Sequence, residues 1–294
     1  MNQIASHIDV GPRDNLEDAA MGLSILPSAV NTGPAYVLAL FDGRGPQFGE
    51  VASSEALVHI PANLLAILAA HAAQPFKAQP SNELIAAALG QILESANQAI
   101  LNRAMEDPAL LGMATTAVCG VVMDDTLIIG WVGDSRCYIH NKNGLRQVNH
   151  DHSRIQELID VGQIERSDAG NHPEAHAITR YLGQAAGFTP ETAVTQLEAG
   201  DVVLLCTDGL TDVLSDEEIA EVIASCRVGR FPFSELPEKL VRQALDAGTC
   251  DNTTALCYHH GSVHIRVNCD RTRTAAYVEA VAHTMSPNKR GALS

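Results

Sequence analysis

The sequence predicts a single α+β domain in which short strands lie on either side of a long helical segment. Apolar runs separated by Asp, Gly and Asn turns are typical of antiparallel strands. Between two sets of such runs, residues 49–106 are rich in alanine and leucine and follow a helical period. No low-complexity segment, repeat or linker divides the 294 residues, a length that suits one large domain.

The first part of the chain predicts two strands followed by two helices. The strands are "QIASHIDVG" (3–11) and the continuous apolar run "AYVLALF" (35–41), which we expect to be covered on both faces. The two helical stretches are separated by "QPFKAQP" (74–80), whose prolines break helices. Ser81, with Glu83 nearby, marks the start of the second helix. Pro61 predicts that the first helix is interrupted.

From residue 114 the pattern returns to strands. "TTAVCGVVM", "TLIIGWV", "RCYIH" and "LRQV" indicate an antiparallel meander over 115–148, and residues 191–209 indicate a hairpin around "EAGD". Helices are expected in 151–162 and in 214–226, where Ser215 and Glu218 form a capping box, with a loop over 167–177 between them. The last expected elements are strands at 253–259 and 263–268, then a helix at 275–285.

Composition and charge exclude several classes of function. The chain is 46% hydrophobic and carries a formal charge of −16, without the basic stripe that nucleic acid or an anionic membrane surface would require. Seven scattered cysteines, none in a CxxC pair, indicate reduced thiols. With no leader sequence and no apolar run near the roughly 20 residues of a membrane span, the expected location is cytoplasmic.

Four aspartates stand at strand ends: Asp42 in "ALFDG", Asp134 in "WVGDS", Asp208 in "LLCTDG" and Asp251 in "GTCDNTT". Each one alone fits a simple turn. Together, carboxylates that meet at one edge of rigid sheets would form the oxygen cage that Mg²⁺ or Mn²⁺ prefers. Cys/His ligand spacing for a structural zinc site is absent from the sequence.

The order of these motifs resembles the metal-dependent protein phosphatases of the PPM family, the type 2C serine/threonine phosphatases, in their bacterial form. The resemblance runs from about residue 5 to 258. It consists of "RDNLED", "FDGRGP", "ATTAV", "VGDSR", "DHS", "ITRYLG", "LLCTDGLTD" and "DNTTA", in the order of the family. It implies a four-layer αββα sandwich, two antiparallel sheets flanked by helices. The phosphatase domain would span 1–260, with 261–294 as an extension of unassigned role that could add a last strand and helix.

The resemblance also implies the roles of individual residues. Asp42 would bridge two Mn²⁺ or Mg²⁺ ions, which lie about 3.5–4 Å apart in two-metal sites, and the Gly43 carbonyl would bind one of them. Asp208 and Asp251 would complete the shell of the first ion. The second ion would be held by Glu17, directly or through water, with Asp18 nearby. Asp134 and Asp212 match positions that hold a weaker third ion in some members.

The implied reaction is attack on phosphoserine or phosphothreonine by a metal-bridging water, without a phosphoenzyme. Arg13 matches the phosphate clamp of the family, a task that suits a guanidinium fork. Arg44 replaces the histidine that many members use to protonate the leaving oxygen, and arginine cannot act as an acid near neutral pH. Arg44 could contact a phosphate or carboxylate of the substrate, or point into solvent.

Histidines in and beside the expected flap offer substitute acids: His150, His152, His172 and His176. A lone histidine in a loop is more commonly a polar surface residue. Their sequence positions alone therefore assign none of them a catalytic role.

Three functions remain open at this level. The first is an active phosphatase whose partner is a phosphoprotein, namely a serine/threonine kinase or its targets, with neither nucleic acid nor membrane as a partner. The second is a catalytically weak or silent phosphoprotein-binding regulator of the same fold. The third is a hydrolase of small phosphate esters. Retention of Asp42, Asp208 and Asp251 favours activity.

Overall fold

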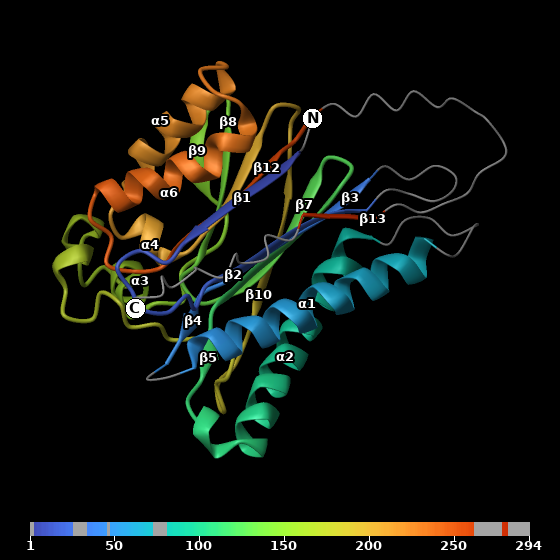
Figure 1. The fold of residues 1–294 in the computed structure, drawn as a ribbon, viewed down its shortest axis with the longest axis vertical. Helices are drawn as coiled ribbons and strands as arrows, with labels where there is room; N and C mark the ends of the chain where they lie inside the picture. The colour runs from blue at the N-terminus through green and yellow to red at the C-terminus, as the bar shows by residue number, and fades with distance from the viewer. Residues whose placement is uncertain (1–2, 26–33, 46–47, 73–80, 262–277, 282–294) are drawn as a thin grey trace, which may run out of the picture.

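The computed structural model describes residues 3–25, 34–45, 48–72, 81–261 and 278–281. Two antiparallel sheets make up its centre (Figure 1). The six-stranded sheet has the order β10 (Glu191–Gln196), β7 (Thr126–Val132), β6 (Ala117–Met123), β3 (Ala35–Phe41), β2 (Ala19–Ile25) and β13 (Val278–Val281). The five-stranded sheet has the order β1 (Ile4–Asp9), β12 (Thr253–His259), β11 (Val202–Cys206), β8 (Arg136–Asn141) and β9 (Gly144–Gln147).

Helices cover the outer face of each sheet (Figure 1). The long helices α1 (Gly49–Ala72) and α2 (Asn82–Glu106) pack on the six-stranded sheet, and α5 (Asp216–Arg227) and α6 (Leu236–Asp246) pack on the five-stranded sheet. The remaining pieces are short: β4 (Gly43–Arg44), β5 (Ala114–Thr115), α3 (Arg154–Asp160), α4 (Asp208–Thr211) and 3-10 turns at Pro108–Leu110, Arg166–Asn171 and Phe233–Glu235. The predicted αββα sandwich is confirmed.

Alternation of side chains along the strands divides the core into three layers. In β3, Val37, Ala39 and Phe41 face the helices α1 and α2, while Leu38 and Leu40 face the other sheet. In β11, Val203 and Leu205 face inward between the sheets. Val202, Leu204 and Cys206 face α5 and α6. Successive strand residues point to opposite faces, so a strand buried on both faces has to be apolar throughout. The prediction for 35–41 is confirmed.

Two predicted strand pairings are wrong, because consecutive strands join different sheets. The chain leaves the six-stranded sheet at the end of β7 and enters the five-stranded sheet at β8, so the expected meander is two separate hairpins, β6–β7 and β8–β9. The expected hairpin around "EAGD" also fails, since β10 pairs with β7 whereas β11 lies between β12 and β8.

Several individual elements also differ from expectation. Helix α1 continues through Pro61 without a break. The expected final helix is a strand over Val278–Val281, paired with β2. Strand β2 and helix α6 were not predicted, while the capping box of α5 is confirmed. The expected strand at 263–268 and the proline-rich segment 74–80 lie outside the described residues.

Helices α1 and α2 are long and apolar enough, by length and composition, to cross a membrane. The expectation that no segment would reach that length is therefore wrong. In the structure both helices pack against the six-stranded sheet, burying residues such as Ile60, Leu64, Leu89 and Leu93. Core helices of soluble proteins meet the same criteria.

Candidate metal centre

Asp42 follows the last residue of β3, and two threonines fix its backbone. The Asp42 N–H donates to Thr116 Oγ1 at 3.1 Å. Its carbonyl oxygen accepts from Thr115 Oγ1 at 2.9 Å and from the Thr116 N–H at 2.8 Å. These contacts explain the "ATTAV" motif, because both hydroxyls are buried at the point where β3 ends beside β6. The carboxylate of Asp42 is thereby held at the edge of the sheet.

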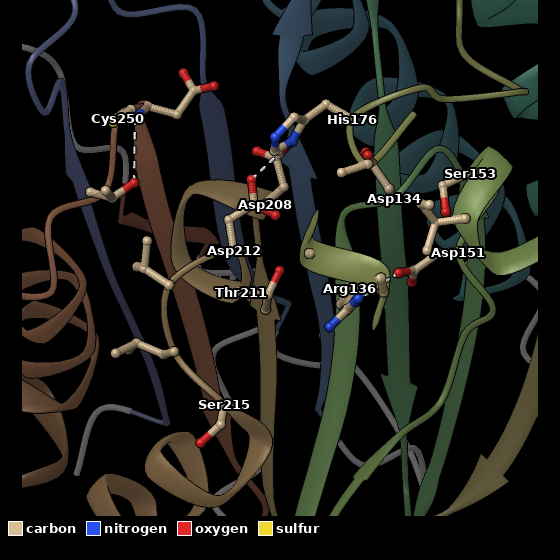
Figure 2. Close-up of a pocket in the computed structure, with 18 of the residues that line it drawn as sticks. Asp134, Arg136, Asp151, Ser153, His176, Asp208, Thr211, Asp212, Ser215 and Cys250 are labelled. Carbon is tan, nitrogen blue, oxygen red and sulfur yellow. Dashed lines mark hydrogen bonds and ion pairs between the residues drawn. The ribbon is translucent and has the colours of Figure 1, made fainter. Parts of the chain in front are cut away.

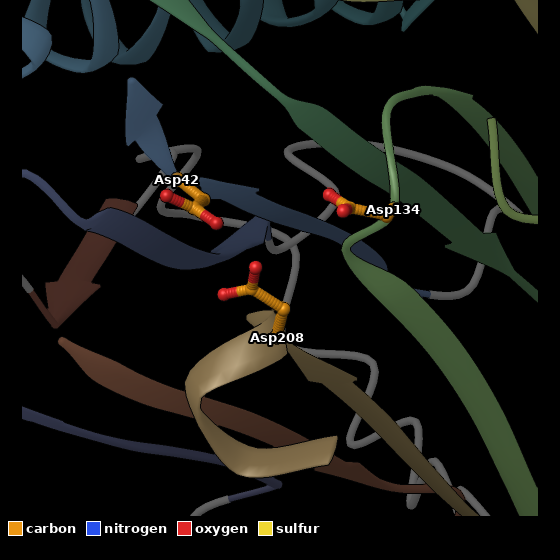
Figure 3. Close-up of side chains that lie close together, drawn as sticks. All are labelled: Asp42, Asp134 and Asp208. Carbon is orange, nitrogen blue, oxygen red and sulfur yellow. The ribbon is translucent and has the colours of Figure 1, made fainter. Parts of the chain in front are cut away.

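Three buried carboxylates converge at this edge (Figure 3). Asp42 comes from the end of β3, Asp134 from the turn between β7 and β8, and Asp208 from the first residue of α4. One ligand oxygen from each lies within 4.8 Å of the others. Three of the four strand-end aspartates therefore meet as the sequence predicts, whereas Asp251 lies outside this group.

Asp42 and Asp134 lie in an environment that disfavours their charge. Burial, followed by repulsion from Asp208, raises the pKa of Asp134 to about 7 and that of Asp42 well above its usual range. Asp42 Oδ2 and Asp134 Oδ1 are buried and have no hydrogen-bond partner among the described residues. Buried carboxylate oxygens without donors are costly unless a cation compensates them. These oxygens therefore fit a divalent cation that prefers carboxylate ligands.

In this structure the compensating cation is Arg44. Its guanidinium makes a short ion pair with Asp208 Oδ2, and lies 3.5 Å from Asp134 Oδ2 and 3.8 Å from Asp42 Oδ2. In a fourth contact, Arg44 Nη1 donates to the carbonyl oxygen of His176 at 3.2 Å. Attraction from the carboxylates outweighs burial and raises the pKa of Arg44 above its usual value. The alternative in which Arg44 points into solvent is not observed, because its side chain is only 24% exposed. A contact of Arg44 with a substrate group stays a prediction.

Glu17 and Asp18 approach the same edge from the chain segment before β2. The Glu17 N–H donates to Asn252 Oδ1 at 2.7 Å, and the Glu17 carbonyl accepts from the Gly43 N–H at 3.1 Å. Burial and the neighbouring Glu50 raise the pKa of Glu17. Gly43 has to be glycine, because a Cβ there would lie 2.4 Å from the Gly49 carbonyl oxygen.

Asp18 is buried and held by two hydroxyl groups. Thr254 Oγ1 donates to Asp18 Oδ2 at 2.6 Å and Thr207 Oγ1 donates to the same oxygen at 3.0 Å. Burial raises the pKa of Asp18 to about 7 despite these hydrogen bonds. At least one oxygen of Asp18 is thus already used by protein donors. The prediction that Asp18 binds an ion directly remains a prediction, and its observed contacts position the segment that carries Glu17.

Arg13 and Asp251 pair with each other at the rim. Arg13 NH2 lies 2.7 Å from Asp251 Oδ2, and Arg13 Nε donates to the Cys250 carbonyl oxygen at 2.8 Å. The Arg13 side chain is 55% exposed, so its guanidinium is accessible to a ligand from solvent. The charge of Asp251 contributes to the raised pKa of Asp18 and to the raised pKa of Arg44, so Asp251 lies near both groups.

A cleft of about 950 Å³ leads from solvent to the carboxylates. Figure 2 shows it between α3 with the 166–177 segment on one side and the α4–α5 connection on the other. Asp212, predicted as a ligand of a third ion, lies in its wall with His176 Nδ1 at 3.3 Å. Burial and Asp208 raise the pKa of Asp212 to about 6. Asp208, Asp134 and Asp212 thus border one continuous cleft.

Sequence reasoning missed the polar residues that hold the acidic ones. Thr116, Thr254 and Asn252 position Asp42, Asp18 and Glu17, respectively. The motifs "ATTAV" and "DNTTA" contain them, but a threonine in a strand is not by itself a sign of such a role.

Glu50 was missed as well. It stands in the first turn of α1, and its buried Oε2 has no hydrogen-bond partner among the described residues. Among the histidines, His152 is buried, at 3% side-chain exposure, and not the surface residue that was expected.

Comparisons with known proteins agree with this geometry. The family Protein phosphatase 2C matches residues 13–253. The serine/threonine phosphatase Stp of Listeria monocytogenes is 34% identical over 168 residues, which cover 57% of this chain and 65% of that protein. The chain therefore matches slightly less than two thirds of that relative's length.

Solved structures are similar over most of the chain. Serine/threonine phosphatase Stp1 from Staphylococcus aureus superposes with a TM-score of 0.74 at 28% identity, covering 88% of this chain and 95% of that one. The catalytic domain of serine/threonine protein phosphatase PstP, in complex with two manganese ions, gives a TM-score of 0.67 at 30% identity and covers 86% and 96%.

Proposed function

This chain belongs to the protein phosphatase 2C family, and from that premise we propose that it is a metal-dependent protein phosphatase acting on phosphoserine and phosphothreonine. The observation that carries the proposal is the convergence of Asp42, Asp134 and Asp208 at the floor of an open cleft, with two buried oxygens that lack donors. Acidic residues that only solvate the surface are exposed to water, whereas these three carboxylates are buried. The manganese ions of the similar PstP structure support the same reading.

The residues proposed to hold two Mn²⁺ or Mg²⁺ ions are those of the converging edge. Asp42 would serve both ions, and the Gly43 carbonyl would serve one of them. Asp208 and Asp251 would complete the shell of the first ion, and Glu17 would serve the second directly or through water. Asp134 and Asp212 would serve a third, weaker ion. Asp18 would hold the chain segment that carries Glu17 in position, because its Oδ2 already accepts two hydroxyl hydrogen bonds. Divalent ions bound there would acidify a water molecule and neutralise the phosphoryl oxygens.

The chain's own residues account for substrate placement. Arg13 stands exposed at the rim, and its guanidinium fork suits two phosphate oxygens once it turns from Asp251. The cleft walls, formed by α3 and by the connection before α5, offer both apolar and acidic side chains to the peptide around the phosphorylated residue. Arg44 cannot donate a proton near neutral pH, so the leaving oxygen would take its proton from water or from His176, which lines the cleft.

The proposed partner is a phosphoprotein, namely a serine/threonine kinase or its targets, and the proposed location is the cytoplasm. The relatives named as serine/threonine phosphatases support the substrate class. The acidic charge of −16 argues against nucleic acid as a partner.

The test is hydrolysis of a phosphothreonine peptide as a function of Mn²⁺ concentration, with EDTA as the metal-free reference. Asp208→Ala should reduce turnover by at least about a hundredfold, since even residues outside the ligand shell change metal sites by 10–100-fold. Asp246→Ala, which removes an exposed carboxylate at the end of α6, is the matched control and should behave as the wild type.

Two outcomes would replace the proposal. If the wild type binds the phosphopeptide at saturating Mn²⁺ but hydrolyses it no faster than Asp208→Ala does, the protein is a silent phosphoprotein-binding regulator. Rapid turnover of p-nitrophenyl phosphate with none of the peptide would identify a hydrolase of small esters.

A further inference from the structure

The backbone of Arg44 is held in place by its neighbours, whereas its side chain can rotate. Gly43 and Arg44 form the short strand β4, which pairs with β5 in the register Gly43↔Thr115 and Arg44↔Ala114. The Gly43 N–H is bonded to the Glu17 carbonyl, and the Gly43 backbone packs tightly against Gly49. Any change in the position of the guanidinium therefore has to come from rotation of the side chain.

The guanidinium contacts the same three carboxylates that are proposed to hold the metal ions. It contacts Asp208 Oδ2, Asp134 Oδ2 and Asp42 Oδ2, the three carboxylates that converge within 4.8 Å. The Arg44 side chain is 24% exposed, so most of it lies inside the centre. An ion held by Asp42 and Asp208 would lie beside a guanidinium that contacts both carboxylates, and the two positive charges would repel each other.

We propose that Arg44 is the counter-ion of the metal-free centre, and that divalent cations bind by displacing its guanidinium into the cleft. This inference rests on the proposed metal-dependent function. Without a cation, three buried carboxylates would face one another, and burial together with mutual repulsion would destabilise the folded chain. Arg44 removes part of that cost, and it does so at the expense of metal affinity. The apparent dissociation constant of the ions equals the intrinsic constant divided by the fraction of molecules in which Arg44 leaves the site open.

Displacement of Arg44 would also release a contact with the cleft wall. Arg44 Nη1 donates to the His176 carbonyl oxygen at 3.2 Å, and His176 itself lies 3.3 Å from Asp212. Arg44 already lines the cleft, so its released side chain enters the space in which the substrate phosphate is proposed to lie. The residue that replaces the usual acid thus acts first on the occupancy of the metal site.

The test compares Mn²⁺ binding to metal-stripped wild type and Arg44→Met by isothermal titration calorimetry, together with the melting temperature in EDTA. Methionine keeps a long side chain and removes the charge. We expect Mn²⁺ to bind Arg44→Met at least about tenfold more tightly, which corresponds to about 1.4 kcal/mol. We also expect the metal-free variant to melt several degrees lower, and Mn²⁺ to raise its melting temperature more than that of the wild type.

Arg154→Met is the matched control. Arg154 is 45% exposed on α3 and pairs with Glu157 and Glu174, away from the converging carboxylates. The control removes one positive charge from the chain and should leave both Mn²⁺ affinity and metal-free stability at the wild-type values.

The outcomes separate this inference from the proposed function. If wild type and Arg44→Met bind Mn²⁺ equally and melt equally in EDTA, the displacement proposal is wrong while the metal centre stands. If neither protein binds Mn²⁺, both proposals are overturned. Should Arg44→Met fold only with Mn²⁺, the proposal is supported. Arg44→Gln, which also removes the charge, then supplies the affinity measurement, and a value equal to that of the wild type would overturn the proposal.

Discussion

Replacing Thr254 with valine would test the hydroxyl support of Asp18. The Thr254 hydroxyl donates to Asp18 Oδ2 at 2.6 Å, and both residues are buried. A hydrogen bond to a charged group contributes about 1.5–3 kcal/mol to stability. For a domain of this size a change of that magnitude would lower the melting temperature by roughly 3–12 °C.

The destabilisation caused by Thr254→Val should depend on pH. Burial raises the pKa of Asp18 to about 7, above its unfolded value, and the Thr254 hydrogen bond opposes that rise. A raised pKa favours folding below the unfolded pKa, and this contribution is lost as pH rises through the folded pKa. Without the Thr254 hydroxyl the folded pKa rises further. The loss caused by Thr254→Val should therefore be larger at pH 8, where wild-type Asp18 is ionised, than at pH 5, where it is protonated.

The assay is urea unfolding in EDTA at pH 5 and pH 8, for the wild type, Thr254→Val and Thr192→Val. Thr192 is exposed on the edge strand β10 and provides the same substitution without a buried partner. It should change the free energy of unfolding by no more than about 0.5 kcal/mol. An equal cost of Thr254→Val at both pH values, or a cost no greater than that of the control, would refute the reasoning.

Three further predictions concern the supports of the site and the core. Burial, and then the charge of Arg180, lowers the pKa of His152 in the folded chain. The free energy of unfolding should therefore fall as pH drops below the pKa of an unfolded histidine, because only the unfolded chain then gains the proton. His152→Gln should flatten this fall between pH 7 and pH 5 in urea titrations. Gly209→Ala would place a Cβ 2.0 Å from the Asn252 carbonyl oxygen and should weaken Mn²⁺ binding in calorimetry, whereas Gly170→Ala, with open space around it, should not. Leu240→Ala, which empties a fully buried position between α6 and β12, should cost about 2–5 kcal/mol in denaturant unfolding without changing Mn²⁺ affinity.

The supports of the acidic residues show why part of the site was hidden in the sequence. Asp42, Asp134 and Asp208 were recognisable because each follows an apolar strand. Thr254 and Asn252 were not, because their partners Asp18 and Glu17 lie more than 230 residues away in the chain. A threonine in a strand has the same local appearance whether it donates to a buried carboxylate or faces solvent.

Strand pairing was also decided beyond the local sequence. The apolar runs at 126–132 and 136–140 predict strands correctly, yet the Gly133–Asp134 turn carries the chain from one sheet to the other. The run 126–132 is apolar on both faces because its sheet is covered by helices on one side and by the other sheet on the other. A uniformly apolar strand gives no register or partner, since either face can be buried against either layer.

By itself, the sequence determined an α+β domain, the strand-end positions of the acidic residues and the two long helices, because apolar periodicity and turn residues act over a few neighbouring positions. The four-layer αββα arrangement was implied by the family resemblance of its motifs. Only the tertiary structure decided which strands pair, that 278–281 adds a strand to the β2 edge, and that Arg44 turns into the centre. The direction of Arg44 depends on the summed field of three carboxylates from distant segments. Such a field exists only after the two sheets have packed and excluded water.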